Sequence, residues 1–204
     1  MKEIHLYVEG SGPTEATRRP LREGMTVFLG ELKARAEGKG IKFMVILCRD
    51  KDRTVDAFKT AVATDPGNFH VVLVDSDSAV SVPRLKHYRE RFKGSWKGVA
   101  ERNCHLMVQV MESWFLADPD ALKTFYSDGF NAKPLPKSKD VETVDKDTVL
   151  KALENATRKA KKGNYHKIKH ASDLLSRIDP IVVRRASRHC DFLFTTLEKV
   201  IEDG

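Results

Sequence analysis

Four short apolar segments, separated by stretches with helical spacing, constrain the fold of this chain more than any other feature. The segments span residues 2–8, 41–48, 69–74 and 103–110. They are apolar almost throughout and do not alternate between apolar and polar residues, which is typical of strands buried on both faces of a parallel sheet. The alternation of strand and helix therefore predicts an α/β fold, with a mainly parallel, Rossmann-like sheet covered by helices on both faces.

The segments between and after the strands predict the helices. A long amphipathic stretch begins at Thr14, which suits an N-cap, and continues to about residue 37 with a kink at Pro20. Later helices are expected at 52–64, 83–93, 149–161, 171–178 and 180–202, the last with a break near 187–189, whereas 128–148 reads as a loop. We expect one domain over 1–204, with a core of about 1–120 and a C-terminal helical layer of about 147–204.

Composition excludes several classes of protein. The three cysteines, Cys48, Cys104 and Cys190, are odd in number and far apart, which argues against a disulfide framework and a cysteine zinc site. Apolar runs are shorter than the roughly 20 residues that cross a bilayer, and the N-terminus has no apolar block typical of a signal peptide. We therefore expect a cytoplasmic protein with no membrane partner.

Acidic residues stand where two of the predicted strands end. Residues 4–8 lead into Glu9, and the apolar run 69–74 leads directly into Asp75 and Asp77. A carboxylate at the end of a buried strand is costly unless it is paired, hydrogen-bonded or bound to a cation. Ligands of open α/β sheets bind outside the carboxyl ends of the strands, where these acids would gather. The sequence predicts an acidic cluster suited to Mg²⁺ or Mn²⁺, both of which prefer oxygen ligands.

Two further acids are candidates for the same cluster. Glu15 would lie in the first turn of the helix after the first strand, either facing the strand ends or complementing the helix dipole. Glu112 interrupts an apolar run after the fourth strand, so it is either buried with a partner or exposed on a helix. Asp118, which precedes a proline, is typical of a helix N-cap.

The net charge of +7 is concentrated towards the C-terminus, where residues 121–204 hold 17 Lys and Arg against 12 Asp and Glu. The segment 158–170 is especially basic and contains Lys161, Lys162, Lys167 and Lys169. A basic surface beside an acidic, metal-binding cluster fits a nucleic acid as substrate. The alternative interpretation is a solvated helix end whose lysines complement the helix dipole.

Motifs for other chemistries are missing from the sequence. His166 and His170 lie four residues apart but lack the carboxylate of a zinc-binding HExxH motif. No serine lies in a G-x-S-x-G context, and the loop after Glu9 lacks the Gly-Lys-Ser/Thr ending of a phosphate-binding Walker loop. The acids and lysines are therefore the main candidates for chemistry.

The chain resembles a Toprim-like bacterial family catalogued as domain of unknown function 4276. The resemblance covers nearly the whole chain and is carried by five blocks of residues: Val8-Glu9-Gly10 with Thr14-Glu15, Val74-Asp75-Ser76-Asp77, 105–118, Tyr165-His166-Lys167, and 171–180 with 188–192. One departure is that the first loop, between Gly10 and Glu15, is about two residues longer than the usual Glu-Gly-x-Thr-Glu.

The resemblance implies a fold and a chemistry. Toprim domains occur in topoisomerases, primases and nucleases of the OLD (overcoming lysogenization defect) family, and they use a strand-end Glu and a DxD pair to hold Mg²⁺ for phosphoryl transfer. On this basis Asp75 and Asp77 would bind Mg²⁺ or Mn²⁺, and Glu9 would share that metal or act as the general base. Glu15 or Glu112 would complete a second metal site, and Lys167 would offset the charge that develops on the phosphate.

Relatives in this family often accompany an ATPase of ABC or AAA type in anti-phage defence, as nuclease effectors that in some systems act on tRNA. We therefore expect a metal-dependent nuclease that acts on DNA or RNA, with an ATPase and a second copy of the chain among its partners. A regulatory subunit whose Toprim-like site has lapsed is the alternative. A small-molecule phosphohydrolase would use the same metal chemistry and stays open.

Overall fold

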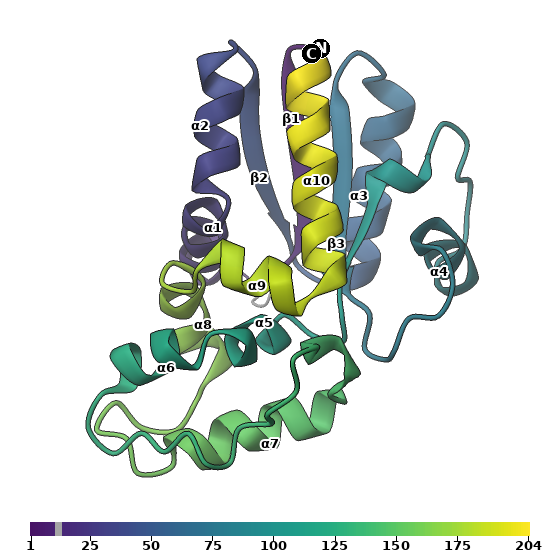
Figure 1. Cartoon of the computed structure of the whole chain (residues 1–204). Coiled ribbons are helices and arrows are strands. Elements are labelled where there is room, and N and C mark those ends of the chain that lie inside the picture. Colours follow the sequence, from purple (N-terminus) through teal and green to yellow (C-terminus); the bar gives the residue numbers. More distant parts are fainter. Residues whose placement is uncertain (11–13) are drawn as a thin grey trace.

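The computed structural model describes residues 1–10 and 14–204, and it has an α/β fold built on a parallel sheet (Figure 1). The sheet has four strands in the order β2-β1-β3-β4, with every neighbouring pair parallel. The strands are β1 (Glu3–Glu9), β2 (Lys42–Cys48), β3 (Phe69–Asp75) and β4 (Cys104–Met107). The predicted fold class is thus confirmed, with each strand within a few residues of its expected position.

The strand order places a topological switch between β1 and β3. The chain passes from β1 outward to β2 on one side and then returns to β3 on the other side of β1. The two strands run in register, with Val8 opposite Leu73, so their carboxyl ends lie side by side. Ligands of open α/β sheets bind in the crevice at such a switch. Glu9 and Asp75 are the last residues of these two strands.

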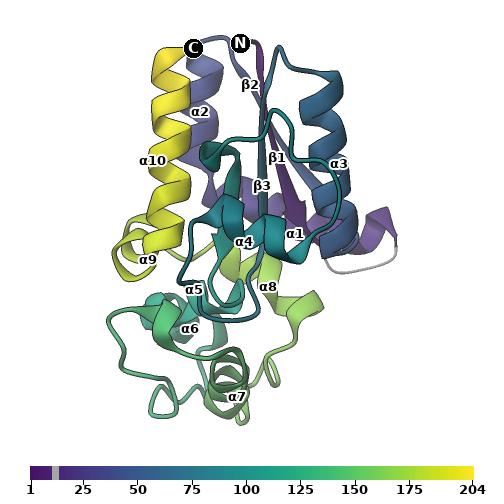
Figure 2. The same ribbon diagram turned by 90° about the vertical axis from the view of Figure 1, so that its right-hand side faces the viewer.

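Helices cover both faces of the sheet, as predicted. One face packs against α1 (Glu15–Phe28), α2 (Gly30–Gly38) and α10 (Arg188–Asp203). The other packs against α3 (Lys51–Thr64) and α4 (Arg84–Arg91). Figure 2 shows the sheet edge-on, with α2 and α10 on one side and α3 on the other.

The predicted long helix after the first strand is divided at Leu29, whereas Pro20 does not end it. Thr14 caps α1 as expected, because its hydroxyl accepts a hydrogen bond from the Thr17 backbone N–H. Pro20 is the sixth residue of α1, where it removes one backbone donor and the helix continues past it to Phe28. Leu29, with φ −95° and ψ 14°, leaves the helical conformation, and α2 begins at Gly30.

The remaining helices form a cap, residues 112–186, that lies beyond the carboxyl ends of the strands (Figure 1). The cap helices are α5 (Glu112–Ala117), α6 (Pro119–Tyr126), α7 (Lys146–Thr157), α8 (Lys167–Leu175) and α9 (Pro180–Ala186), and short 3-10 turns occur at η1 (Glu101–Asn103) and η2 (Val141–Thr143). The predicted C-terminal helical layer is therefore split between two places. Helix α10 packs on a face of the sheet, whereas α7, α8 and α9 lie in the cap. Within the described ranges, no helix has the length and apolar character needed to span a bilayer.

Two tight contacts fix the cap to the sheet. The ring of Trp114 in α5 is fully buried and stacks on Phe28 of α1, with 5.1 Å between ring centroids. Gly24 of α1 lies so close to α8 that a Cβ atom there would be 2.4 Å from the carbonyl oxygen of Ser172. Because α1 and α8 are in backbone contact, the start of α8 has a fixed position relative to the carboxyl ends of the strands.

Candidate functional site

The acids at the ends of β1 and β3 lie together at the switch point. The backbone N–H of Asp75 donates a hydrogen bond to Oε2 of Glu9 over 3.3 Å. Oδ1 of Asp75 accepts a hydrogen bond from the Met111 N–H, which comes from the start of the cap, over 2.8 Å. Asp75 is buried, so its carboxylate is held between the sheet and the cap.

Asp77 follows in a sharp turn. Its φ of 59° is in the left-handed region, which aspartate tolerates better than most residues, and its N–H donates to the carbonyl of Gln109 over 2.8 Å. Its carboxylate contacts two lysines. Lys146 Nζ lies 2.8 Å from Oδ1, and Lys51 Nζ contacts Oδ2 and lies 3.8 Å from Oε2 of Glu9.

Glu112 is the most buried acid of the site, with only 1% of its surface exposed. It is the first residue of α5. Its Oε1 accepts a hydrogen bond from the Tyr165 hydroxyl over 2.9 Å and lies 3.5 Å from Lys167 Nζ. Its Oε2 is buried and has no hydrogen-bond partner among the described residues. Of the two alternatives for Glu112, the structure therefore selects burial with partners.

Three lysines converge on the acids, each from the first residue of a different helix. Lys51 begins α3, Lys146 begins α7 and Lys167 begins α8. Lys167 Nζ bridges the two buried acids, 3.6 Å from Oδ2 of Asp75 and 3.5 Å from Glu112. The N-terminus of a helix carries partial positive charge, so a lysine at its first residue is unfavourable for the helix itself. Its occurrence three times at one site points to a role in binding negative charge.

Burial and neighbouring charges shift the pKa values of these groups in opposite directions. Burial raises the pKa of Asp75 to about 7; Lys167 opposes this shift, and Glu112 and Glu9 add to it. For Asp77, burial also acts to raise the pKa, but hydrogen bonds from Lys146 and Lys51 outweigh it and leave the pKa lowered. For Lys167, burial is outweighed by Asp75 and Glu112, which raise its pKa.

The donor set fits a hard divalent cation. Glu9, Asp75, Asp77 and Glu112 offer only carboxylate oxygens, the ligands that Mg²⁺ and Mn²⁺ prefer. Glu112 has one oxygen without a partner in the described part of the chain, and Asp75 is held among acids in a way that disfavours its charge. A bound cation would give the Glu112 oxygen a partner and would stabilise the charge of Asp75. Asp77 differs, because it already contacts Lys51 and Lys146.

Comparison with known protein families gives a match over most of the chain. The profile of a domain of unknown function, DUF4276, matches residues 8–198 and so covers the end of β1, the other three strands, the cap and most of α10. The chain belongs to the DUF4276 family. No curated protein and no solved structure matches this DUF4276 chain. The acids and lysines of the site all lie within the matched residues.

Glu15 is placed differently from the prediction. It begins α1 but is exposed, and it forms ion pairs with Arg22 and, over 3.6 Å, with Arg18. Those arginines lie three and seven residues further along the same helix face and hold the carboxylate against α1, not against the strand-end acids. The structure therefore does not bring Glu15 together with the other predicted metal ligands. Part of the preceding loop, residues 11–13, lies outside the described residues.

The other basic candidates of this DUF4276 protein are exposed. Lys161 and Lys162 follow α7, and the ammonium of Lys162 lies 4.9 Å from the centre of the Phe125 ring. Lys169 is exposed on α8, two residues after Lys167, the lysine that contacts the buried acids. Their contact with nucleic acid stays a prediction. Asp118 is an N-cap as expected, because it accepts from the Ala121 N–H over 3.0 Å.

A second group of metal-binding side chains lies away from the acids. His5 and His70 are paired across β1 and β3, and Asp65 ends α3 beside them, so that one donor atom from each falls within 4.8 Å of the others. The sequence did not predict this group, because the strand register brings together residues that are 65 positions apart. In the structure His5 Nε2 contacts Glu3 and His70 Nε2 contacts the Asp65 carbonyl, over 2.6 and 2.8 Å.

Replacing Lys167 by methionine should destabilise the protein by about 1–3 kcal/mol, because Glu112 would keep its burial and lose its cation. Urea unfolding at neutral pH measures the change. Lys169→Met is the matched control, since it removes the same charge from an exposed position on the same helix and should change stability by less than about 0.5 kcal/mol. Equal losses in the two variants would contradict the proposed role of Lys167 at the buried acids.

Proposed function

We propose that this protein is a nuclease of Toprim type that hydrolyses phosphodiester bonds with Mg²⁺ or Mn²⁺. The observation that carries the proposal is the convergence of three lysines, each at the start of a helix, on four acids at the carboxyl edge of the sheet. Carboxylates suit a divalent cation, and cations at helix N-termini suit a phosphate. A site that combines both is suited to phosphoryl transfer.

The residues of this chain would divide the work of hydrolysis. Glu9 is the acid best placed to accept a proton from the attacking water, because it is partly exposed at the end of β1 and the hydrogen bond that it accepts from Asp75 is long. The water oxygen would bond to phosphorus as the ester oxygen leaves and takes a proton from solvent. Lys167 and Lys51 would offset the negative charge that develops on the phosphate oxygens.

Asp75 and Glu112, with Glu9 beside them, would hold the metal. Both are buried; burial raises the pKa of Asp75, and Oε2 of Glu112 has no hydrogen-bond partner among the described residues. A divalent ion bound there supplies Lewis-acid polarisation of the phosphate and lowers the pKa of water. Asp77 would join as a ligand once Lys51 or Lys146 turns to the phosphate. Tyr165 would orient Glu112 through its hydrogen bond to Oε1.

A role as effector in bacterial anti-phage defence, with an ATPase partner of ABC or AAA type, rests on the family resemblance alone. The site itself supports hydrolysis over strand passage, because the tyrosine that contacts the acids, Tyr165, is partly buried, has a raised pKa and donates a hydrogen bond to Glu112. A tyrosine held in this way is a poor nucleophile.

An interaction or regulatory subunit with a lapsed site is the second candidate. One observation favours it: Lys51 and Lys146 already neutralise Asp77 without a cation. In that case the lysines would be structural partners of the acids, and the cap would be held shut on the sheet. The two proposals differ in whether the acids bind a divalent metal.

Calorimetric titration with Mn²⁺ separates the two proposals, and cleavage assays on double-stranded DNA, single-stranded DNA and tRNA complete the test. We expect Mn²⁺ to bind and EDTA to abolish cleavage. Metal binding needs no partner protein, so the absence of any Mn²⁺ binding would overturn the nuclease proposal and favour the interaction subunit. Glu15→Gln is the control, because Glu15 contacts its own helix and its replacement should leave Mn²⁺ affinity unchanged.

A further inference from the structure

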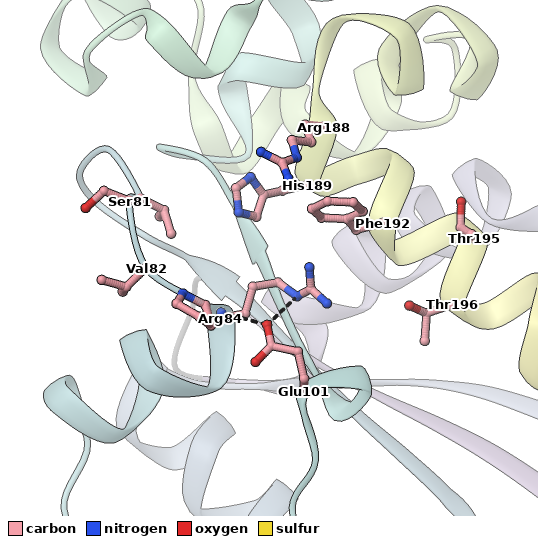
Figure 3. Close-up of a pocket in the computed structure, with 11 residues that line it drawn as sticks. Ser81, Val82, Arg84, Glu101, Arg188, His189, Phe192, Thr195 and Thr196 are labelled. Atoms are coloured by element: carbon pink, nitrogen blue, oxygen red, sulfur yellow. Dashed lines mark hydrogen bonds and ion pairs between the residues drawn. The ribbon is translucent and has the colours of Figure 1, made fainter.

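A cavity lies between the loop that precedes α4 and the start of α10. It has a volume of about 600 Å³, within the range of cavities that hold small ligands, and is lined by the loop before α4, by Glu101 and by the first turns of α10. Figure 3 shows residues of α10 on one side and Ser81 and Val82 on the other, with Arg84 and Glu101 between them. The loop that leads into the cavity connects β3 to α4 and includes Asp77.

Two guanidinium groups meet the same aromatic ring in this cavity. Arg84 lies 4.8 Å and Arg188 lies 4.9 Å from the centre of the Phe192 ring. Arg84 is committed to the protein, because its Nε donates to the Cys104 carbonyl over 2.7 Å. Arg188 is exposed, and no hydrogen bond or ion pair holds it among the described residues. Arg188 is thus a cation fixed against a ring with its donors open to a ligand.

The acid that lines the cavity does not cancel this charge. The two carboxylate oxygens of Glu101 accept the backbone N–H groups of Arg84 and Leu85, over 2.8 and 3.0 Å. Glu101 therefore satisfies the first turn of α4 and also lies 3.6 Å from Arg84 Nε. The negative charge of Glu101 is therefore directed at α4 and Arg84, and it does not neutralise the positive charge of Arg188.

His189, which lines the same cavity, is held by the partly buried carboxylate of Glu142. Its Nδ1 lies 2.8 Å from Oε2 of Glu142, and Oε1 of Glu142 accepts both the Ser187 hydroxyl and the His189 N–H over 2.6 Å. Burial acts to raise the pKa of Glu142, but hydrogen bonds from His189 and Ser187 outweigh it and lower the pKa, so the carboxylate is ionised at neutral pH. His189 then donates through Nδ1, and the Nε2–H of its imidazolium form is the donor that remains for a phosphate oxygen.

We propose that this cavity binds a phosphoryl group through Arg188 and His189, with the hydroxyl of Thr196 as a further donor. The planar guanidinium of arginine can donate two parallel hydrogen bonds to phosphate oxygens, and the imidazolium of His189 adds a directed donor that the Glu142 hydrogen bonds hold in place. The phosphoryl group belongs either to a free nucleotide or to a nucleic-acid strand that continues from the acidic site. The strand as source rests on the proposed function, whereas binding of the phosphoryl group does not.

Calorimetry in EDTA tests the proposal without metal and without turnover. The probes are adenosine 5′-monophosphate and, as the ligand without a phosphate, adenosine; fluorescence anisotropy with a labelled single-stranded oligonucleotide forms the second arm. We expect Arg188→Gln to weaken binding of the phosphate probe by about tenfold or more. Arg185→Gln removes the same charge from an exposed position on α9 and should change affinity less than about twofold.

The two arms identify the source of the phosphate. Dependence on Arg188 in the mononucleotide arm supports a free nucleotide, and dependence in the oligonucleotide arm alone supports the strand. The proposal is overturned if neither probe distinguishes Arg188→Gln from Arg185→Gln, or if adenosine binds as tightly as the monophosphate. Because no cleavage is measured, failure of the nuclease proposal leaves these outcomes unchanged.

Discussion

Replacement of Asp75 by asparagine should lower metal-dependent cleavage by about three orders of magnitude or more. Asparagine has the same shape, and its side-chain oxygen can still accept the Met111 N–H, so the turn at the end of β3 is retained. What is lost is the negative charge at the centre of the acidic site. Metal catalysis stabilises the transition state of phosphoryl transfer by several kcal/mol, and each 1.36 kcal/mol corresponds to about a factor of ten in rate.

Single-turnover cleavage with saturating Mn²⁺ measures this effect, since it separates chemistry from product release. Asp120→Asn is the matched control, because Asp120 is exposed at the start of α6 and its replacement should leave the rate within about twofold. A rate for Asp75→Asn within tenfold of wild type, in protein that is folded, would contradict a metal-binding role for Asp75. It would leave the α/β fold and the family membership untouched.

The acids of the site were within reach of sequence reasoning, and the reason is geometric. Apolar runs that end in Glu9 and Asp75 mark strand ends, and a parallel sheet collects its carboxyl ends at one edge. Glu112 was visible as an acid in an apolar run, although the sequence left open whether it is buried. Lys167 was predicted through the family resemblance, because a lysine in a basic segment is by itself indistinguishable from its exposed neighbours.

The remaining partners could not be predicted, because they depend on how the cap packs on the sheet. Lys51 and Lys146 reach Asp77 across 26 and 69 positions of sequence. Local spacing carries no information about such contacts. A signal was present all the same: Lys51 and Lys146 each directly follow an aspartate that caps the helix they begin. Lysine is unfavourable at that position, so its repetition indicates a function outside the helix.

The misplacement of Glu15 has a local cause. The sequence indicated correctly that Glu15 opens a helix, but the competing cations on the same helix decide where its carboxylate points. Arg18 and Arg22 lie close to the Glu15 carboxylate along α1 and hold it at the surface. Arginines one and two turns further along a helix lie on the same face as a carboxylate in its first turn. They pair with that carboxylate more readily than groups of another element do.

The same Asp75→Asn substitution should stabilise the metal-free protein at pH 8, by up to about 4 kcal/mol. Asp75 has a pKa of about 7 in the folded chain, because burial and the neighbouring acids disfavour its charge, against about 3.9 in an unfolded chain. Between pH 4 and pH 7 the folded state therefore holds a proton that the unfolded state has released. The free energy of unfolding of the wild type falls as the pH rises through this window.

Urea unfolding in EDTA at pH 4.5 and pH 8 measures the prediction as a difference between variant and wild type, which removes the contribution of other titrating groups. The advantage of Asp75→Asn should be small at pH 4.5 and largest at pH 8. Mn²⁺ at pH 8 should reduce the difference by stabilising the wild type, because a ligand that binds only the folded state raises its stability.

Asp77→Asn supplies the control with the opposite sign. Contacts with Lys146 and Lys51 lower the pKa of Asp77, so its ionised form favours the folded state above pH 4 and that contribution is lost as the pH falls. The side chain is 39% exposed, which limits the effect to less than about 1 kcal/mol. Two aspartates two residues apart should thus respond in opposite directions to the same isosteric change. A loss of stability in both variants at pH 8 would mean that Asp75 acts as a structural carboxylate and is not held, at a cost to folding, for a cation.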